Sequence, residues 1–349
     1  MTIVADAYQY VVGVDTHART HTFAVLDTRT GAVTATDTFP TTPAGFRRAI
    51  TWITHRVDGL ALLAVECVGS YGAQVAKAAG DHGFTVVEPL PVAVGIKQGH
   101  GKSDPLDAAW IARSVVGADT STLRHPRDDG GIRAALRVLV AARDQITADH
   151  TRTINMLTAL TRTIDLGVDA RHPLTTPQIR QIAAWKPRHE PLAEATARRE
   201  AIRLATRITT IDTDLADNRA DITALIHASH AAPLLDHPGI GVITAAVVLT
   251  AWSHAGRIHS EAAFAMLAGV APIPASSGNT TRYRLNRGGD RRLNQALNTI
   301  VLTRLRVDPA TRAYHDRRLT EGLTPREIRR ILKRYIARQI YRELAHTTN

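Results

Sequence analysis

The apolar residues at the start of the chain fall in short runs that predict a sheet. Residues 11–14 form one apolar run, and residues 21–27 and 31–39 follow as strand-like runs joined by the turn "TRTG". Three consecutive antiparallel strands should therefore open the fold. Helices and strands then alternate, which predicts an α/β domain with a mixed sheet. The later expected elements are helices at 42–57, 69–83 and 104–117 and strands at 60–68 and 84–90.

From residue 131 the apolar pattern changes to heptad spacing. One series is interrupted by Arg143, His150 and Thr153, and a second, cleaner series carries Asn218 on its seam. This spacing predicts two long coiled-coil helices, in which a buried Asn often sets register and oligomeric state. A helical hairpin within one chain is an equally good interpretation. Residues 166–195, which contain four prolines, should form an irregular tip. The two series are Ile132, Leu136, Leu139, Ile146, Leu157, Leu160 and Ile164, and Leu204, Ile208, Ile211, Leu215, Ile222 and Leu225.

The last third of the chain is expected to be mainly helical. The stretch "PGIG" between two apolar helices resembles a helix-hairpin-helix turn, in which Gly239 and Gly241 would offer backbone N–H groups to a phosphate. A plain interhelical turn is the alternative. A loop rich in Ser, Gly and Arg follows, and Thr324, Pro325 and Glu327 begin a final basic helix. The apolar stripe of that helix is Ile328, Ile331, Leu332, Tyr335 and Leu344.

The charge balance points to a polyanionic partner. The chain has 43 Lys and Arg against 32 Asp and Glu, a net charge of +11, which favours nucleic acid over membrane. The excess of Arg over Lys is attributed mainly to GC-rich codon usage. Cys67 is the only cysteine, residues 1–10 lack the apolar segment of a signal peptide, and the longest apolar run, 242–252, is too short to span a bilayer. We therefore expect a soluble, cytoplasmic protein.

Two carboxylates three residues apart allow two interpretations of the stretch "KSDPLDAAW". Asp104 could be the N-cap of a helix, with Pro105 as its first residue and Asp107 as the acid that reaches back to the cap. Alternatively, both carboxylates lie on one helical face and bind a metal ion. The two roles are compatible, because a capping carboxylate can also bind a metal.

Two further acids favour the metal interpretation. Asp15 ends the first predicted strand, and Glu66 occupies the same kind of position near the end of the strand at 60–68. Four close carboxylates repel one another unless cations lie between them. Two Mg²⁺ or Mn²⁺ ions about 4 Å apart would fit such a site and suit phosphodiester chemistry. His17 is interpreted as a neighbour rather than a ligand, because hard cations prefer oxygen.

The strand order and the acids resemble the ribonuclease H-like fold of RuvC-type nucleases. With the C-terminal half included, the chain contains the motifs "GVDTH", "ECVGSYG", "KSDPLDA", the coiled coil, "PGIG" and "LAGVAPIPASSGN…RLNRGGDRRLNQAL", in that order. In this layout the chain from about residue 10 to 345 resembles the DEDD transposases of the insertion sequence 110 family. The implied organisation is a RuvC-like metal-binding domain at 1–125, a coiled-coil hairpin at 126–230 and a mainly helical transposase domain at 231–349.

The resemblance also implies a chemistry and its residues. The catalytic and metal-binding acids would be Asp15, Glu66, Asp104 and Asp107. A serine, either Ser277 or its neighbour Ser276, with Ser277 preferred, would attack a DNA phosphate and form a covalent phosphoserine link. A structured bridge RNA would pair with donor and target DNA, and the protein would work as a homo-oligomer, a dimer or a dimer of dimers. Arginines that follow the serine would hold the nucleic acid: Arg282, Arg284, Arg287, Arg291 and Arg292.

Two other functions are compatible with parts of this pattern. A stand-alone metal-dependent nuclease or junction resolvase would share the four acids but would have no use for the serine loop. A coiled-coil DNA-binding protein with a decayed site would need neither. The presence of four acids and the serine in one chain argues against decay.

Overall fold

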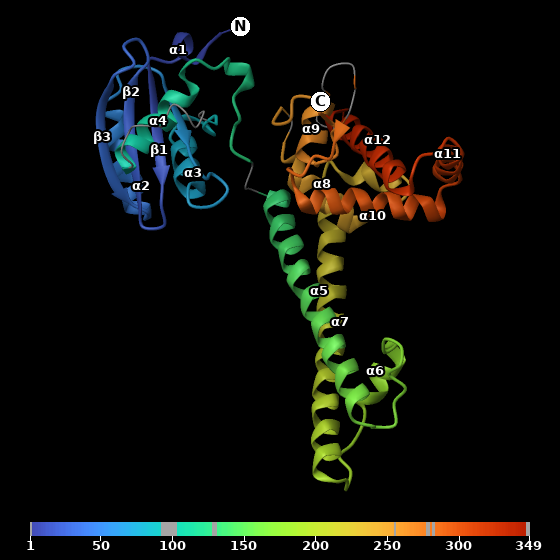
Figure 1. The fold of residues 1–349 in the computed structure, drawn as a ribbon. Coiled ribbons are helices and arrows are strands. Elements are labelled where there is room, and N and C mark those ends of the chain that lie inside the picture. Colours follow the sequence, from blue (N-terminus) through green and yellow to red (C-terminus); the bar gives the residue numbers. More distant parts are fainter. Residues whose placement is uncertain are drawn as a thin grey trace. The chain divides into compact units, whose positions relative to one another are not determined.

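The computed structural model describes residues 2–91, 103–127, 131–254, 256–276, 280 and 283–346. The chain forms two compact units, Met1–Arg127 and Asp128–Asn349, whose elements are labelled in Figure 1.

The first unit is a five-stranded mixed sheet between two layers of helices. Its strand order is β3-β2-β1-β4-β5, with β1, β2 and β3 antiparallel and β1, β4 and β5 parallel. The predicted ribonuclease H-like fold class is therefore confirmed. The strands are β1 Tyr10–Thr16, β2 Thr20–Asp27, β3 Val33–Pro40, β4 Ala61–Val65 and β5 Thr85–Val87. The helices are α1 Val4–Ala7, α2 Pro43–Thr54, α3 Ala73–Asp81 and α4 Asp104–Val116, followed by the 3-10 turn η2 Thr120–Thr122.

Alternation along β1 separates the two cores of this unit. Val12 and Val14 pack with α2 and α3, whereas Val11 packs with α1 and α4 on the opposite face. Both faces of β1 are thus covered, which explains why its sequence is apolar at successive positions and does not alternate with polar residues.

Strand β4 is shorter than the predicted strand at 60–68, and α3 begins later than the predicted helix at 69–83. The chain turns sharply after Val65, where Cys67 adopts a positive φ of 50°. Gly72 closes this turn, since a Cβ atom there would lie 2.3 Å from the carbonyl oxygen of Glu66. The turn leaves Glu66 one residue beyond the end of β4.

Helix α4 lies against β1 at Gly13. A Cβ atom at this glycine would lie 2.0 Å from the Ala108 carbonyl oxygen and 2.6 Å from the Ala112 nitrogen. Residues four apart share one face of a helix, and residues two apart share one face of a strand. The helix stripe Ala112, Ala108 and Asp104 therefore follows the strand positions 11, 13 and 15, and places Asp104 near Asp15.

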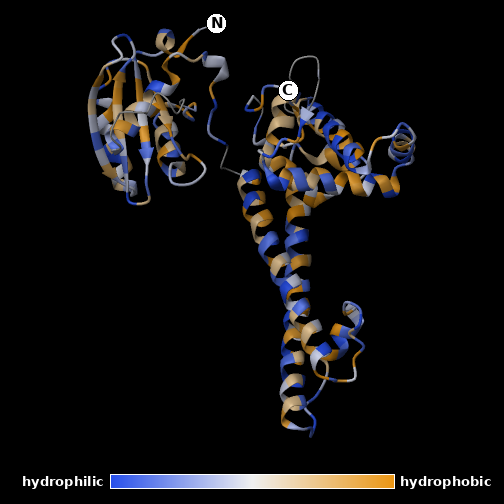
Figure 2. Ribbon diagram, in the orientation of Figure 1, coloured by the Kyte–Doolittle hydropathy of each residue, from blue (hydrophilic) through white to orange (hydrophobic). Residues whose placement is uncertain are grey.

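The second unit contains the two predicted long helices, α5 Gly131–Thr163 and α7 Leu192–His227, packed side by side (Figure 1). Figure 2 shows apolar and polar residues alternating along both helices. All predicted seam residues are buried or half-buried. The Asn218 side chain is 6% exposed and donates to the Leu139 carbonyl oxygen at 3.0 Å, so its amide is paired within the same chain.

The expectation of an irregular segment at 166–195 is wrong in part. Residues Thr176–Ala183 form helix α6, and α7 already begins at Leu192. The Gln178 side chain accepts the Thr175 backbone N–H at 2.9 Å, a contact that supports the start of α6. Ile179 is buried against α7, which holds this short helix in place. A proline in the first turn, Pro177, is compatible with this start because its missing N–H would have no helical partner.

The remaining elements form a helical group with one large apolar core. This core also contains residues of α5 and α7, among them Leu136 and Ile222. The elements are η3 Ala232–Asp236, α8 Val242–Trp252, α9 Glu261–Leu267, β6 Ile273–Pro274, β7 Tyr283–Arg284, α10 Arg291–Val307, α11 Pro309–Thr320 and α12 Pro325–His346. Across the described residues, none of the helices has the length and apolarity that a membrane span requires.

The final helix starts where its sequence predicts. The Glu327 side chain accepts the Thr324 backbone N–H at 2.9 Å, and Ile328, Leu332 and Leu344 are buried. Tyr335, expected on the apolar stripe, is instead 49% exposed.

The contact at Gly13 generates a stability prediction. Gly13→Ala should lower the free energy of unfolding by about 3 kcal/mol or more, the upper end of overpacking effects, because the atoms in the way are backbone. Urea denaturation of the full chain measures this loss. Gly117→Ala is the matched control, since no atom of the described residues lies within 4 Å of a Cβ atom there and φ is −88°. Equal stability of the two variants would contradict the close approach of α4 to β1.

Candidate functional site

Helix α4 begins one residue earlier than the capping interpretation requires. Ser103 is the N-cap, Asp104 is the first helical residue and Pro105 the second, so the prediction that Asp104 is the cap is wrong. The first helical hydrogen bond runs from the Asp107 N–H to the Ser103 carbonyl oxygen at 2.9 Å. Pro105 is tolerated at the second position because the first-turn N–H groups have no intrahelical acceptor. The Asp104 side chain, 56% exposed, is therefore available for another role.

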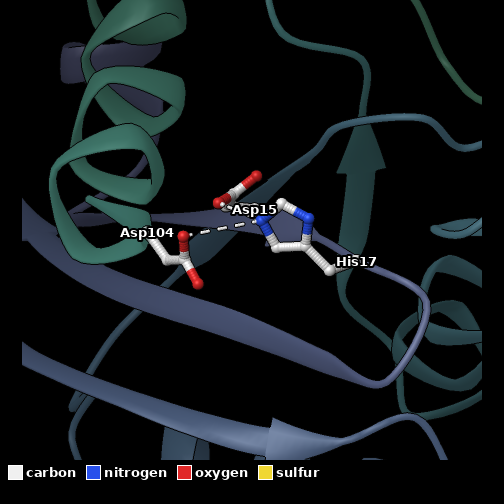
Figure 3. Close-up of side chains that lie close together, drawn as sticks. All are labelled: Asp15, His17 and Asp104. Carbon is white, nitrogen blue, oxygen red and sulfur yellow. Dashed lines mark hydrogen bonds and ion pairs between the residues drawn. The ribbon is translucent and has the colours of Figure 1, made fainter. Parts of the chain in front are cut away.

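Asp15, His17 and Asp104 converge beside the end of β1 (Figure 3). The His17 Nε2 atom lies 3.2 Å from a carboxylate oxygen of Asp15 and 3.6 Å from one of Asp104. One ligand atom from each residue lies within 4.8 Å of the others, which is close enough for all three to share one ion. The interpretation of His17 as a neighbour rather than a ligand stays a prediction, but its imidazole faces both carboxylates.

Burial makes the ionised form of Asp15 unfavourable. The residue is 5% exposed, and desolvation, the largest effect, raises the pKa of its carboxyl. The negative charges of Asp107 and Asp104 raise this pKa further, and His17 opposes them. These interactions show that both acids of α4 lie within electrostatic reach of Asp15. A bound cation would reverse this effect, because it favours the charged carboxylate.

Glu66 is placed at the same edge of the sheet through the backbone. Val14 pairs with Val65 in the parallel register of β1 and β4, and the Glu66 N–H donates to the Val14 carbonyl oxygen at 3.2 Å. The Thr16 hydroxyl donates to the Glu66 carbonyl oxygen, also at 3.2 Å. The Glu66 side chain is exposed and the Asp107 side chain is half-buried. The structure therefore groups Asp15, His17 and Asp104 directly, and brings Glu66 to the strand end beside them.

The two glycines of "PGIG" have different surroundings. Gly239 has a φ of +78°, and a Cβ atom there would lie 3.0 Å from the Ile300 carbonyl oxygen of α10. Gly241 is the N-cap of α8, and within the described part of the chain nothing lies within 4 Å of a Cβ atom there. Both glycines line a cavity of about 500 Å³ together with Arg219. Arg304, which the sequence did not single out, fixes the turn by donating to the Pro238 carbonyl oxygen at 2.7 Å.

The serine loop is only partly within the described residues. Ser276 is exposed, whereas Ser277 and Arg282 lie outside the described residues. The other arginines predicted to hold nucleic acid are exposed, and Arg292 forms an ion pair with Asp144 of α5 at 2.7 Å.

Comparison with known proteins identifies both halves of the chain. A family model described as transposase, that of the DEDD domain of IS110 elements, matches residues 12–164. A second model, described as transposase IS116/IS110/IS902 family, matches residues 231–316. The insertion element IS900 uncharacterized 42 kDa protein of Mycobacterium paratuberculosis is 31% identical over 277 residues, or 66% of this chain and 68% of that protein.

A second relative extends the match. The insertion element IS110 uncharacterized 43.6 kDa protein of Streptomyces coelicolor is 28% identical over 313 residues, or 76% of this chain and 77% of that protein. With the mixed sheet and the carboxylates of Asp15 and Asp104 in place, these matches show that the chain belongs to the IS110 family of DEDD transposases, enzymes that act by phosphoryl transfer on DNA.

Proposed function

We propose that this transposase is RNA-guided and cuts and rejoins DNA by serine attack, assisted by divalent ions held by Asp15, Glu66, Asp104 and Asp107. The observation that carries the proposal is the convergence of the buried Asp15 carboxylate and the Asp104 carboxylate at the end of β1. One ligand atom of each carboxylate, together with one of His17, lies within 4.8 Å of the others, which is close enough to share one ion.

The donor set fits Mg²⁺ or Mn²⁺. Carboxylate oxygens are the ligands these ions prefer, and Asp15 is a buried acid whose ionised form needs a nearby positive charge. The acids number four, which is enough to share two ions. When bound, such ions stabilise the negative charge that develops on a phosphodiester and help to generate the nucleophile.

The nucleophile in this proposal is the Ser277 hydroxyl. Its oxygen forms a bond to phosphorus, the bond from phosphorus to a deoxyribose oxygen breaks, the serine proton is released and the departing oxygen takes up a proton. The resulting phosphoserine is itself a phosphodiester, so the DNA can be rejoined without an added energy source. In the rejoining step a deoxyribose hydroxyl attacks the phosphorus and displaces the serine. Serine is a weak nucleophile and needs such activation. Arg284, Arg287 and Arg291 would contact the DNA backbone beside the loop.

Sequence choice would be delegated to a structured RNA that pairs with donor and target DNA. A chain with a net charge of +11 is suited to binding backbones of both nucleic acids. Recombination joins two duplexes and cuts four strands, so several copies must act together. We propose a dimer or a dimer of dimers, in which the serine of one chain meets the acids of another. The division into domains at 1–125, 126–230 and 231–349 belongs to the same proposal.

The first prediction concerns the acids. Asp15→Asn, Glu66→Gln, Asp104→Asn and Asp107→Asn should each abolish recombination and weaken Mn²⁺ binding, because each removes a charged oxygen donor. Isothermal titration with Mn²⁺ and a recombination assay measure the two effects, and thermal unfolding checks the fold.

The controls for the acid variants lie in the same unit. Asp37→Asn, an exposed acid on the edge strand β3, should leave both measurements unchanged, and His17→Ala should cause a smaller loss than Asp15→Asn. Full activity of the Asp104 and Asp107 variants would mean that this stretch only begins helix α4.

The second prediction concerns the serine. Ser277→Ala should eliminate a covalent protein–DNA adduct and recombination while preserving DNA and RNA binding, and Ser276→Ala should be milder. The adduct is trapped on labelled DNA, the protein is denatured, and the linked peptide is mapped. An adduct lost only in Ser276→Ala would move the nucleophile one residue upstream. No adduct with wild-type protein would instead favour a plain metal-dependent nuclease.

The third prediction concerns assembly. Light scattering of the protein on its guide RNA and DNA should give the mass of a dimer or a tetramer, and RNA binding should weaken steeply as salt is raised. A monomer under these conditions would contradict the shared-site arrangement. Salt-independent RNA binding would contradict recognition of the RNA backbone.

A further inference from the structure

Two adjoining cavities of different chemistry lie between helix α12 and the loop at residues 285–290. This loop follows the hairpin of β6 and β7, which we call the serine hairpin. Strands β6 and β7 are the two sides of this hairpin, and the connection between them carries Ser276 and Ser277. The cavities share the lining residues Gly269, Leu285, Asn286 and Arg330, so they are contiguous.

The first cavity, of about 490 Å³, is strongly cationic. Four cationic residues line it, and Asp290 supplies the one carboxylate among its described lining residues. The four are Arg287, Arg291, Arg330 and Lys333. The Asp290 carboxylate is already engaged as the cap of α10, where it accepts the Leu293 N–H at 3.0 Å. The excess of positive charge fits an anion.

Lys333 is the least solvated of these cations. Burial, and then the charges of Arg330 and Arg329, lower the pKa of its ammonium group. The group donates to the side-chain oxygen of Asn294 at 3.0 Å, which fixes its position. A phosphate in the cavity would relieve the repulsion between these like charges.

Two contacts join the wall of the cationic cavity to the end of helix α9. The Asn294 amide donates to the Ala268 carbonyl oxygen at 2.7 Å, which ties α10 to the end of α9. Gly289 has a φ of +93°, and a Cβ atom there would lie 2.6 Å from the Leu267 carbonyl oxygen. The backbone of the loop is thus held close to the end of α9.

The second cavity, of about 320 Å³, is lined by exposed aromatic and aliphatic groups. Tyr283 is 64% exposed and Tyr335 is 49% exposed. The Tyr335 ring is held edge-on by Tyr314, with the ring centroids 6.0 Å apart. Arg334 also lines this cavity, and its Nη1 atom is buried without a hydrogen-bond partner among the described residues. Aromatic rings and an unsatisfied donor together suit a nucleobase.

We infer that these two cavities bind one unpaired nucleotide of a DNA strand, with its base against Tyr335 and Tyr283 and its phosphate between Lys333 and Arg330. A base inside a duplex already stacks on both faces, so this site selects a single-stranded or flipped nucleotide. The choice of DNA rests on the proposed function, because the same hairpin carries the serine proposed to attack DNA. The site would hold the strand while that serine acts.

The test uses the full-length Ser277→Ala protein without divalent metal, so binding is measured apart from chemistry. Single-stranded DNA oligonucleotides, each with one 5-iododeoxyuridine, should crosslink on irradiation to Tyr335 or Tyr283, as mapped by mass spectrometry. Tyr335→Ala should weaken binding of single-stranded DNA by about 5- to 100-fold, whereas Tyr335→Phe, which keeps the ring, should bind normally. Lys333→Met should lower the slope of log affinity against log salt by about 0.7.

The controls separate this site from the general basic surface. Arg326→Gln removes an exposed arginine of the same helix that lines neither cavity, and it should cause a smaller loss than Lys333→Met. Equal losses for single-stranded and duplex DNA in Tyr335→Ala would overturn the unpaired-nucleotide site. A loss confined to RNA oligonucleotides of the same sequence would overturn the assignment to DNA. Absence of a covalent adduct in the wild-type protein would sink the serine proposal but leave these binding results unchanged.

Discussion

The close contact of helix α4 with strand β1 is the constraint on which the candidate metal site depends. Gly13 presents no side chain to α4, so the helix backbone lies directly on the strand. The four-residue stripe of α4 then follows the two-residue alternation of β1, and Asp104 falls beside Asp15. A larger residue at 13 would move the helix away from the sheet and with it both acids of its first turn. The spacing of carboxylates in the site is thus set by a residue that has no functional group.

The sequence predicted the strands and long helices of the fold, but not the first residue of α4 or the presence of α6. Apolar runs and helical spacing are local properties, so the mixed sheet and the long helices followed from them directly. The first residue of α4 did not follow, because Ser103 and Asp104 are both good N-cap residues and the local sequence does not distinguish them. In the structure Ser103 is the N-cap, and a carboxylate oxygen of Asp104 lies 3.6 Å from His17 Nε2. Helix α6 was missed because prolines at 173, 177, 187 and 191 suggested irregular structure, although Pro177 in a first turn is compatible with a helix.

Side-chain direction was the other feature that local patterns could not settle. Tyr335 has the right spacing for the buried stripe of α12, yet it is half exposed and packs against Tyr314 of α11. In the long hairpin, two of the three interruptions of the first heptad series make polar contacts with the other helix, whereas the Thr153 hydroxyl donates to the Asp149 carbonyl oxygen of its own helix. Arg143 donates to the Asn218 side-chain oxygen at 3.2 Å, and His150 contacts Asp212 at 2.9 Å. Since a shift of one helix along the other would separate these pairs, they fix a register that apolar residues alone would leave ambiguous.

Each unit contains a buried or half-buried group whose charged form is disfavoured, an acid in the first unit and a lysine in the second. In the first, burial and the negative charges of Asp107 and Asp104 raise the pKa of Asp15, and His17 offsets only part of this effect. In the second, burial and the charges of Arg330 and Arg329 lower the pKa of Lys333. A divalent cation would stabilise the charged form of Asp15, and a nucleic-acid phosphate would stabilise the charged form of Lys333. Because the cation also adds positive charge to a chain already at +11, it strengthens attraction for the phosphate, and thermodynamic linkage makes that effect reciprocal. Metal binding and nucleic-acid binding should therefore favour one another even where their residues do not touch.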